Sequence, residues 1–417
     1  MWSASATRCT SSQNSRDEGI RGRISCRETV KVPDVPVPLR VEVVVGRYRP
    51  DRDGVSGYVE RLVAALPDVG VRASVTEWPG IRTWRPQPGA DLVHVQFAPS
   101  AYRYSGDIGL LPIRSGLPVV TTLHEYGWWN WSPVPGWLPL VGTPVAALSR
   151  GAERTGRWDR ETLLLAPASR ALVVTGTGHA DVVRERLRRN ADVVPIGANV
   201  GRAYSRDRRS ARAELQLAED APLLVFFGFV HPVKGLRYLL EAVAELRRTR
   251  PGLTLAVVGG WRSLAWPDDE ADAFVAELRE HGRALGLMDG GLDDDAVRFC
   301  GFLDEQDASR WLTAADVAVL PFTAGITAKS GSLLTCWTHG LPVVATEPPD
   351  GPDPDVTGAI AACRIRDTPT LRNALANVLD DRLERERLAY AGSSRMAGRS
   401  WPEVAHDQAE LYRRVLG

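Results

Sequence analysis

Short apolar runs alternate with amphipathic stretches along the chain from about residue 40 onward. Runs such as residues 40–45 and 223–227 are almost continuously apolar, which is typical of strands buried on both faces of a parallel sheet. Between such runs, apolar residues recur at helical spacing, as in residues 235–249. The alternation predicts an α/β fold with doubly wound parallel sheets, in which functional loops follow the carboxyl ends of the strands.

The alternation restarts in the second half of the chain, so it predicts two Rossmann-like halves. The first half is expected to hold strands at residues 40–45, 71–76, 90–95, 117–123, 171–175 and 191–196, and helices at residues 58–65, 161–170 and 181–189. The second is expected to hold strands at residues 223–227, 254–258, 297–299, 317–321, 342–346 and 358–363, and helices at residues 235–249, 268–287, 307–314, 332–339, 368–380, 382–391 and 401–416, with a linker and helix within 201–219. Loops 46–57, 96–104 and 124–131 should then face one crevice.

Residues 314–346 read as a strand, a loop of small residues, a helix from about residue 332 and a second strand. A loop that ends at a helix N-terminus presents free N–H groups, and the helix dipole there favours negative charge. Lys329 stands beside this N-terminus. We interpret the stretch as a site for the diphosphate of a nucleotide-sugar, although a loop with an ordinary N-cap fits this stretch alone about as well.

Lysine is rare in this chain. Of 51 basic residues only Lys31, Lys234 and Lys329 are lysines. Such an Arg-rich chain is typical of a GC-rich genome, in which lysine codons are scarce. Lys234 and Lys329 both fall in loops that lead into predicted helices, where a compact point charge suits phosphate. Chance placement is the alternative interpretation.

Composition argues against several functions. The 417-residue chain has a formal net charge of +0, which gives no general attraction to nucleic acid or to an anionic membrane. Its 5 cysteines lack CxxC spacing, which argues against a zinc site or a disulfide scaffold and suits a reducing cytoplasm. The acidic runs 268–270 and 293–295 suit a solvated surface better than metal ligands. No apolar run reaches the roughly 18 residues of a membrane span.

Two stretches stand apart from the alternating pattern. Residues 1–39 are polar and then Pro-rich, and we expect a disordered leader or a misassigned start. Residues 126–137 (YGWWNWSPVPGW) gather tryptophans among proline and glycine. Three interpretations of this second stretch stay open. It is an aromatic platform for an acceptor sugar, a patch that enters a membrane interface, where tryptophan favours the headgroup level, or a loop anchored by its own aromatic side chains.

Two successive α/β halves and a terminal helix are also the order of elements in GT-B glycosyltransferases. Over about residues 40–417 the chain resembles the large retaining GT-B family that includes glycogen-synthase-like and mannosyl-type transferases, family 4 of the sugar transferases. The motifs that carry the resemblance are VFFGFVHPVKG (225–235), VRFCGFLDEQDASRWLTAADVAVL (297–320), GLPVVAT (340–346) and SWPEVAHDQAELYRRVL (400–416). After the leader expected from composition (1–39), the resemblance implies an acceptor domain (40–203), a donor domain (204–399) and a last helix (400–417) that crosses back to the acceptor domain.

The resemblance also implies roles for residues around the donor. Lys234 and Gly235 match the Lys-Gly pair that grips the donor diphosphate, and the loop that begins at Gly301 matches the loop whose backbone reads the nucleobase. Asp316 is a family-typical position that we expect to orient structure and not to touch substrate. The donor-binding residues that we expect are Gly228, Lys234, Gly235, Gly301, Phe302, Leu303, Thr327, Lys329, Ser330, Gly331, Ser332 and Thr335.

Further matches concern the acceptor and the chemistry. His124, at the end of TTLHEY, matches a histidine close to the transferred sugar, and Gly54 and Gly57 match a Gly-rich loop near the donor phosphate or the acceptor. The resemblance implies no protein nucleophile, since the leaving diphosphate helps to deprotonate the acceptor. Catalysis would then depend on positioning and charge stabilisation, for which we expect His124, Lys234 and Lys329. The acceptor-binding residues that we expect are Asp53, Gly54, Gly57, Glu125 and Trp128.

Two features depart from the family pattern. The family carries a Glu-x7-Glu pair near the donor sugar and ribose, and counting back from Gly340 these positions are Thr327 and Thr335. A threonine hydroxyl still bonds a sugar hydroxyl, but charge-assisted bonds are roughly twice as strong as neutral ones. Phe229 stands where the family often has an arginine. We therefore hypothesise that Lys329 supplies the second diphosphate cation.

Together these observations predict a glycosyltransferase that moves a sugar from a nucleotide-diphosphate donor to an acceptor hydroxyl, with retention and without a metal or cofactor. The expected setting is bacterial glycan, glycolipid or natural-product biosynthesis in the cytoplasm or at the inner membrane face. Expected partners are the nucleotide-sugar and a small-molecule, lipid-linked or glycan acceptor, with no nucleic acid and no prediction of oligomeric state. Two alternatives stay open: a catalytically silent nucleotide-binding partner of an active transferase, and an enzyme of the same fold with other coupling chemistry.

Overall fold

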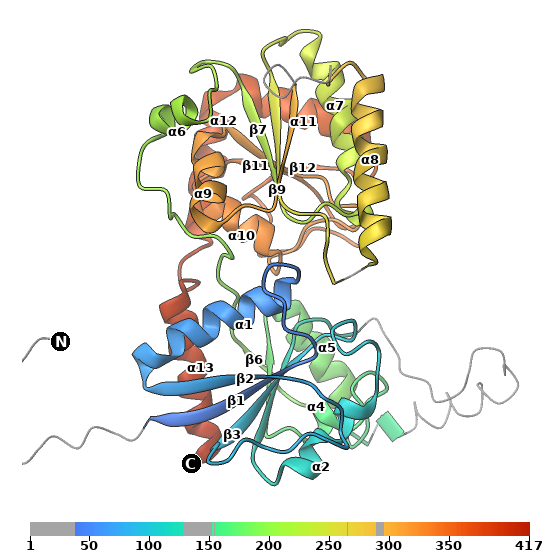
Figure 1. Cartoon of the computed structure of the whole chain (residues 1–417), viewed down its shortest axis with the longest axis vertical. Coiled ribbons are helices and arrows are strands. Elements are labelled where there is room, and N and C mark those ends of the chain that lie inside the picture. Colours follow the sequence, from blue (N-terminus) through green and yellow to red (C-terminus); the bar gives the residue numbers. More distant parts are fainter. Residues whose placement is uncertain (1–37, 128–151, 154, 265, 289–295) are drawn as a thin grey trace, which may run out of the picture. The chain divides into compact units, whose positions relative to one another are not determined.

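The fold is built on two six-stranded parallel sheets, seen in a computed structural model that describes residues 38–127, 152–153, 155–264, 266–288 and 296–417 (Figure 1). The first sheet has the order β2-β1-β3-β4-β5-β6 and the second the order β12-β11-β10-β7-β8-β9. Every strand pair in both sheets is parallel. The α/β fold class predicted from the sequence is therefore confirmed.

The strands of the first sheet are short, and its inner strands are buried on both faces because helices cover the sheet. The strands are β1 (Leu39–Val45), β2 (Val71–Glu77), β3 (Leu92–Phe97), β4 (Val119–Leu123), β5 (Ala171–Val174) and β6 (Asp192–Val193). The helices described in this half are α1 (Gly54–Ala65), η1 (Leu66–Val69), η2 (Asp107–Leu110), α2 (Leu111–Ser115), α4 (Leu165–Ala168) and α5 (Thr177–Leu187). All six residues of β3 are buried, including two polar ones, His94 and Gln96.

The second sheet reverses its strand order between β7 and β10, which makes that point the topological switch at which open α/β sheets bind ligands. Its strands are β7 (Leu223–Phe227), β8 (Thr254–Val258), β9 (Val297–Gly301), β10 (Val317–Leu320), β11 (Val343–Thr346) and β12 (Ala361–Cys363). The helices after the first sheet are α6 (Arg208–Glu214), η3 (Pro232–Lys234), α7 (Leu236–Arg247), α8 (Asp268–Ala284), α9 (Glu305–Ala314), α10 (Gly331–Thr338), α11 (Thr368–Asp380), α12 (Arg382–Ser394) and α13 (Trp401–Leu416).

Several helices begin or end at other residues than predicted, and for two of them the structure shows the cause. Helix α1 begins at Gly54 and not at residue 58, because the Asp53 carboxylate caps it by accepting the N–H of Ser56 at 2.8 Å. The helix predicted over residues 161–170 is confined to Leu165–Ala168. Leu163 has a φ of +57°, and it exchanges two backbone hydrogen bonds with Asp159 in an antiparallel bridge, so the chain turns here and the helix begins only at Leu165.

The last helix, α13, packs into the core of the first half, beside α1 (Figure 1). Ser400 and Glu403 form a capping box at its start. Val404, Leu411 and Tyr412 are each at most 1% exposed and belong to the same apolar cluster as the strand β1. This last helix of the chain therefore completes the apolar core beside the first sheet, which contains β1.

Asp316, directly before β10, bonds to the start of β7 and to a buried arginine. Its carboxylate accepts the N–H of Leu223 at 2.8 Å and pairs with Arg212 at 2.7 Å, and Arg212 is itself 1% exposed. Arg212 also donates to the carbonyl of Ala314 at 2.9 Å. This carboxylate orients structure at the start of two strands and lies away from the cavity described below.

None of the helices in the described ranges combines the length and the apolar character that crossing a bilayer requires. Cys300, Cys336 and Cys363 carry free thiols.

Candidate functional site

A cavity of about 800 Å³ opens where loops from the carboxyl ends of strands in both sheets meet. Its wall includes residues that follow β1 and β4 in the first sheet, and β7, β8 and β10 in the second. Both halves contribute at the end of the sheet where doubly wound folds bind ligands. A cavity of this size accommodates a ligand as large as a nucleotide or a small glycoside.

Glycines let three loops of the second half approach one another at the cavity. A Cβ on Gly259 would lie 2.0 Å from the carbonyl oxygen of Gly228, and one on Gly228 would lie 2.7 Å from Oγ of Ser332. Both glycines have positive φ angles, +137° at Gly228 and +150° at Gly259. Side chains at these positions would separate the loops, so glycine is required for the backbone to form this part of the wall.

Lys234 presents an ammonium to this cavity from the short helix η3. Gly235 ends η3 at a φ of +70°, where a Cβ would lie 1.9 Å from the carbonyl oxygen of Pro321. The Lys234 Nζ lies 3.6 Å from the centre of the Phe322 ring, and no carboxylate of the described residues pairs with it. Burial without an opposite charge lowers the pKa of Lys234 from 10.5 to about 8.

The N-terminus of α10 supplies further hydrogen-bond donors. Ser330 caps the helix by accepting the N–H of Leu333 at 3.4 Å. The N–H groups of Gly331 and Ser332 have no partner among the described residues, and both residues line the cavity. A Cβ on Gly331 would lie 2.7 Å from Nδ2 of Asn199. A helix end of this kind favours an anion, because its free N–H groups and its dipole point the same way.

Lys329 lies in the wall but contacts the first half of the protein. Its Nζ is 3.3 Å from Nε2 of His179, which belongs to α5. Burial and the Lys329 charge lower the pKa of His179 to about 4, so the imidazole is neutral and accepts the hydrogen bond. Burial raises the pKa of nearby Glu125, and the Lys329 charge partly offsets this increase. Lys329 therefore stands between a neutral imidazole and a carboxylate, without a direct ion pair.

His124 stands at the end of β4 on a chain of buried polar groups. Its Nε2 is 2.7 Å from Oε1 of Gln96, whose Nε2 lies 3.1 and 3.2 Å from the two ring nitrogens of His94. His94 in turn contacts the hydroxyls of Tyr412 at 2.6 Å and Thr122 at 2.7 Å. Burial, followed in size by the neighbouring His179, lowers the pKa of His124 to about 3, so this imidazole is neutral at physiological pH.

Most of the residues predicted for the site come together in the cavity. Those in its wall are Asp53, Gly54, Gly57, His124, Glu125, Gly228, Lys234, Phe302, Leu303, Thr327, Lys329, Ser330, Gly331 and Ser332. Gly235, Gly301 and Thr335 are not in the wall, and Thr335 is fully buried with its hydroxyl 3.4 Å from the backbone N of Val200. Trp128 and the other tryptophans of residues 128–137 lie outside the described residues.

The predicted roles of the acceptor-side residues are refined by their local contacts. Asp53 caps α1, and Gly54 and Gly57 fall in the first turn of that helix. Their part of the wall is thus a helix N-terminus and not a flexible Gly-rich loop. Gln96 and His179 were not among the site residues predicted from the sequence. Gln96 carries a signal, because His94 and Gln96 are the polar residues of the apolar run LVHVQF and fall on one face of the strand. His179 carries none.

A buried ionic cluster anchors the chain directly after Glu125. Arg186 contacts three carboxylates of the same half, at 3.0 Å from Glu153, 3.1 Å from Asp159 and 3.0 Å from Glu161. Tyr126 donates its hydroxyl to Asp159 at 3.1 Å, and Gly127 donates its N–H to Glu161 at 2.7 Å. Burial raises the pKa of Glu161 to about 7 despite these contacts. The cluster therefore fixes the backbone that follows β4, and with it the position of the cavity wall.

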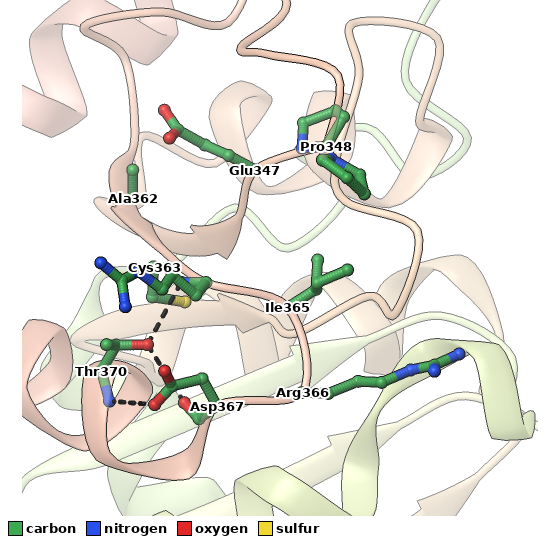
Figure 2. Close-up of a pocket in the computed structure, with 10 residues that line it drawn as sticks. Glu347, Pro348, Ala362, Cys363, Ile365, Arg366, Asp367 and Thr370 are labelled. Carbon is green, nitrogen blue, oxygen red and sulfur yellow. Dashed lines mark hydrogen bonds between the residues drawn. The ribbon is translucent and has the colours of Figure 1, made fainter.

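A second pocket, of about 680 Å³, lies at the ends of β11 and β12 (Figure 2). Two hydrogen bonds lie in its wall: Asp367 caps α11 by accepting the N–H of Thr370 at 3.0 Å, and the Thr370 hydroxyl accepts the N–H of Arg364 at 3.2 Å. Burial raises the pKa of the Cys363 thiol to about 12. A thiol of that pKa is not a nucleophile at neutral pH.

Neither pocket presents a cluster of metal ligands: within the described ranges, no three His, Cys, Asp or Glu side chains are grouped to hold a metal ion.

Two Rossmann-like halves around a cavity define the GT-B class of fold, and solved structures agree. The chain superimposes with a TM-score of 0.62 on sucrose-phosphate synthase from Thermosynechococcus elongatus, at 18% identity, covering 90% of this chain and 99% of that one. It superimposes with a TM-score of 0.61 on Anabaena HepE in complex with UDP-glucose, at 15% identity, covering 90% of this chain and 100% of that one.

Sequence comparison identifies the family. Residues 221–381 match the family described as glycosyl transferases group 1. A D-inositol 3-phosphate glycosyltransferase from Saccharomonospora viridis is 30% identical over 352 residues, which cover 79% of this chain and 72% of that relative. D-inositol 3-phosphate glycosyltransferase 2 from Catenulispora acidiphila is 30% identical over 306 residues, covering 69% of this chain and 64% of the relative. The chain belongs to the group 1 glycosyltransferase family.

Proposed function

We propose that this protein transfers a sugar from a nucleotide-diphosphate donor to a hydroxyl group of an acceptor, with retention of configuration and without a metal ion. The observation that carries the proposal is a set of hydrogen-bond donors in one cavity that have no anionic partner among the described residues. The ammoniums of Lys234 and Lys329 have no carboxylate partner among the described residues, and the N–H groups of Gly331 and Ser332 are free at the start of α10. Such a set fits a doubly charged diphosphate.

The comparisons support the same substrates. HepE, which shares the fold, has been solved with UDP-glucose. The relatives described above are named D-inositol 3-phosphate glycosyltransferases. We infer a nucleoside diphosphate sugar as the donor and take a phosphorylated cyclitol as the first acceptor to test, ahead of lipid-linked and glycan acceptors. Bacterial glycan, glycolipid or natural-product biosynthesis is the setting that we propose.

The charges in the cavity suggest how the transfer would be promoted. Negative charge develops on the leaving diphosphate as its bond to the sugar breaks, and preorganised donors in a cavity stabilise it without reorganisation. Lys234 and the α10 amides are positioned to do this together. The diphosphate would also raise the lowered pKa of Lys234, because an opposite charge favours the ammonium. His124 lies across the cavity wall from these groups, in the other half of the protein.

Binding of the nucleotide tests the first half of the proposal. A thermal-shift panel of UDP, GDP, ADP and dTDP should reveal one preferred base, since a ligand at 100 times its Kd stabilises by about 2.7 kcal/mol. Lys234→Ala and Lys329→Ala should each weaken the response. The matched control is Arg237→Ala, which removes an exposed cation from α7 that pairs with Glu277 outside the cavity. Equal responses in all three variants would refute a diphosphate site.

Transfer of radiolabelled sugar tests the second half and separates it from a silent binding protein. The silent alternative has one observation in its favour. Thr327 presents a neutral hydroxyl to the cavity and Thr335 is buried, so neither supplies a carboxylate there. Nucleotide binding without hydrolysis or transfer of any donor would favour the silent protein. Sugar transfer that is lost in Lys234→Ala, while the folded protein remains, would favour the enzyme.

A further inference from the structure

The buried polar residues under His124 form a continuous chain that reaches the last helix of the protein. Gln96, His94 and Thr122 are each 0% exposed, in the middle of the first sheet. Tyr412 of α13, also 0% exposed, closes the far end of the chain through its hydroxyl. Buried polar groups are costly unless their partners are satisfied, and a fully satisfied network is rigid. The network therefore holds the Gln96 side chain in one place.

The Gln96 amide lies between the His94 ring and His124. Burial lowers the pKa of His94 to about 3, so this imidazole is neutral and has one N–H and one lone pair. Its two ring nitrogens contact the hydroxyls of Tyr412 and Thr122, and the Gln96 amide nitrogen lies against the same ring. The amide nitrogen faces the His94 ring, and the amide oxygen faces His124, 2.7 Å from its Nε2. An oxygen of this kind only accepts, so Nε2 of His124 has to carry a proton.

We propose that Gln96 is a positioning residue that fixes His124 as the Nε2–H tautomer and leaves its Nδ1 as a hydrogen-bond acceptor. Nδ1 would receive a hydrogen bond from a substrate hydroxyl in the cavity, whose wall includes His124. The tautomer of His124 depends only on contacts within the protein. The contact of its Nδ1 with a substrate hydroxyl rests on the proposed function. Helix α13, which is distant in sequence, holds His94 through the Tyr412 hydroxyl, and His94 in turn contacts the Gln96 amide.

The surroundings of His124 keep it neutral across the physiological range. The titratable groups that face it are Tyr58 of α1, with ring centres 4.9 Å apart, His94 of β3 and His179 of α5. Beyond His179 lies the Lys329 ammonium, which opposes a second positive charge nearby. His124 is therefore expected to accept hydrogen bonds through Nδ1 over the whole pH range from 5 to 8, in which an ordinary histidine titrates.

Nitrogen-15 NMR of histidine-labelled protein tests the tautomer without any need for activity. The chain has 7 histidines, so the spectrum is simple, and loss of one signal in His124→Phe assigns the residue. We expect the Nε2–H tautomer for His124 in the wild type. In Gln96→Met, which keeps the side-chain length and removes the acceptor, we expect a mixture of tautomers. Thr121→Val is the matched control, since it removes a buried hydroxyl of β4 that contacts Ser169 and not the chain of groups from Gln96 to Tyr412.

The outcomes separate this inference from the proposed function. An Nδ1–H tautomer in the wild type would overturn the proposal, whatever the variants do. If transfer is found, Gln96→Met should lower kcat by about tenfold with a smaller change in the donor KM, as expected when a group oriented for the transition state is lost. An unchanged kcat would overturn the role toward substrate. If no transfer is found while the tautomer is as expected, the positioning stands and the proposed function fails.

Discussion

Replacing Lys234 with methionine should stabilise the ligand-free protein while it weakens nucleotide binding. The Lys234 ammonium lies beside the Phe322 ring, and no carboxylate of the described residues pairs with it. The drop in its pKa from 10.5 to about 8 corresponds to about 3 kcal/mol of cost for the charged form. Contact with the Phe322 ring, which methionine partly retains, and partial access to water reduce the gain. We expect about 1–2 kcal/mol of net stabilisation at pH 7.

The effect should depend on pH with a defined sign. Between pH 8 and 10.5 the folded state binds fewer protons at Lys234 than the unfolded state does, so wild-type stability rises with pH in this window. Methionine does not titrate. The advantage of Lys234→Met should therefore be full below pH 8 and should vanish by about pH 10.5.

Thermal unfolding at pH 7 and pH 10 measures both effects. At pH 7 the transition of the second half should rise by about 2–8 °C, from the usual scaling of Tm with stability for domains of this size. The increase in Tm on adding the preferred nucleotide should shrink in the variant. Arg237→Met is the control, because that cation is exposed and paired, and its loss should change stability by less than about 0.5 kcal/mol. A ligand-free Lys234→Met protein that is less stable than the wild type at pH 7 would refute the reasoning.

Three further substitutions test the scaffold around the cavity. Gly235→Ala should lower stability by about 3 kcal/mol or more in denaturant unfolding, because a Cβ there would lie 1.9 Å from the Pro321 carbonyl; an unchanged midpoint would contradict this. Arg186→Met should cost about 3–5 kcal/mol by the same assay, since it leaves three buried carboxylates without their shared cation, and Arg184→Met, on the exposed face of the same helix, is its control. Tyr412→Phe should cost about 1–3 kcal/mol, because it removes the buried hydroxyl that lies 2.6 Å from a ring nitrogen of His94; a neutral result would contradict this.

Much of the fold could be predicted because its determinants are local. The boundaries of β7, β8, α11 and α13 coincide with the predictions, since continuous apolar runs and amphipathic helices with caps are visible in the sequence itself. The helix predicted over residues 161–170 was wrong for most of its length. There the side chains of Asp159 and Glu161 serve a buried cluster around Arg186, and this tertiary demand overrides helical spacing.

The candidate site was predictable in part for a related reason. Residues that follow strand ends in a parallel sheet meet at one edge, so Lys234 and Lys329 could be placed together from the element order of the second half. His124 could be added to them only through the resemblance to GT-B glycosyltransferases. Contacts between the two halves could not be predicted in this way. Lys329 meets His179, which lies 150 residues earlier in the chain and has no motif around it.

The sequence alone determined the two α/β halves, the resemblance to the family and the two lysines of the cavity, because these depend on residue type, spacing and order. Only the tertiary structure decided the chemical state of the groups. Whether Lys234 is easily deprotonated, or which nitrogen of His124 carries its proton, depends on which partners surround the group and on how much water reaches it. Those partners come from α13, β3 and Phe322, far along the chain, and no local pattern encodes their meeting.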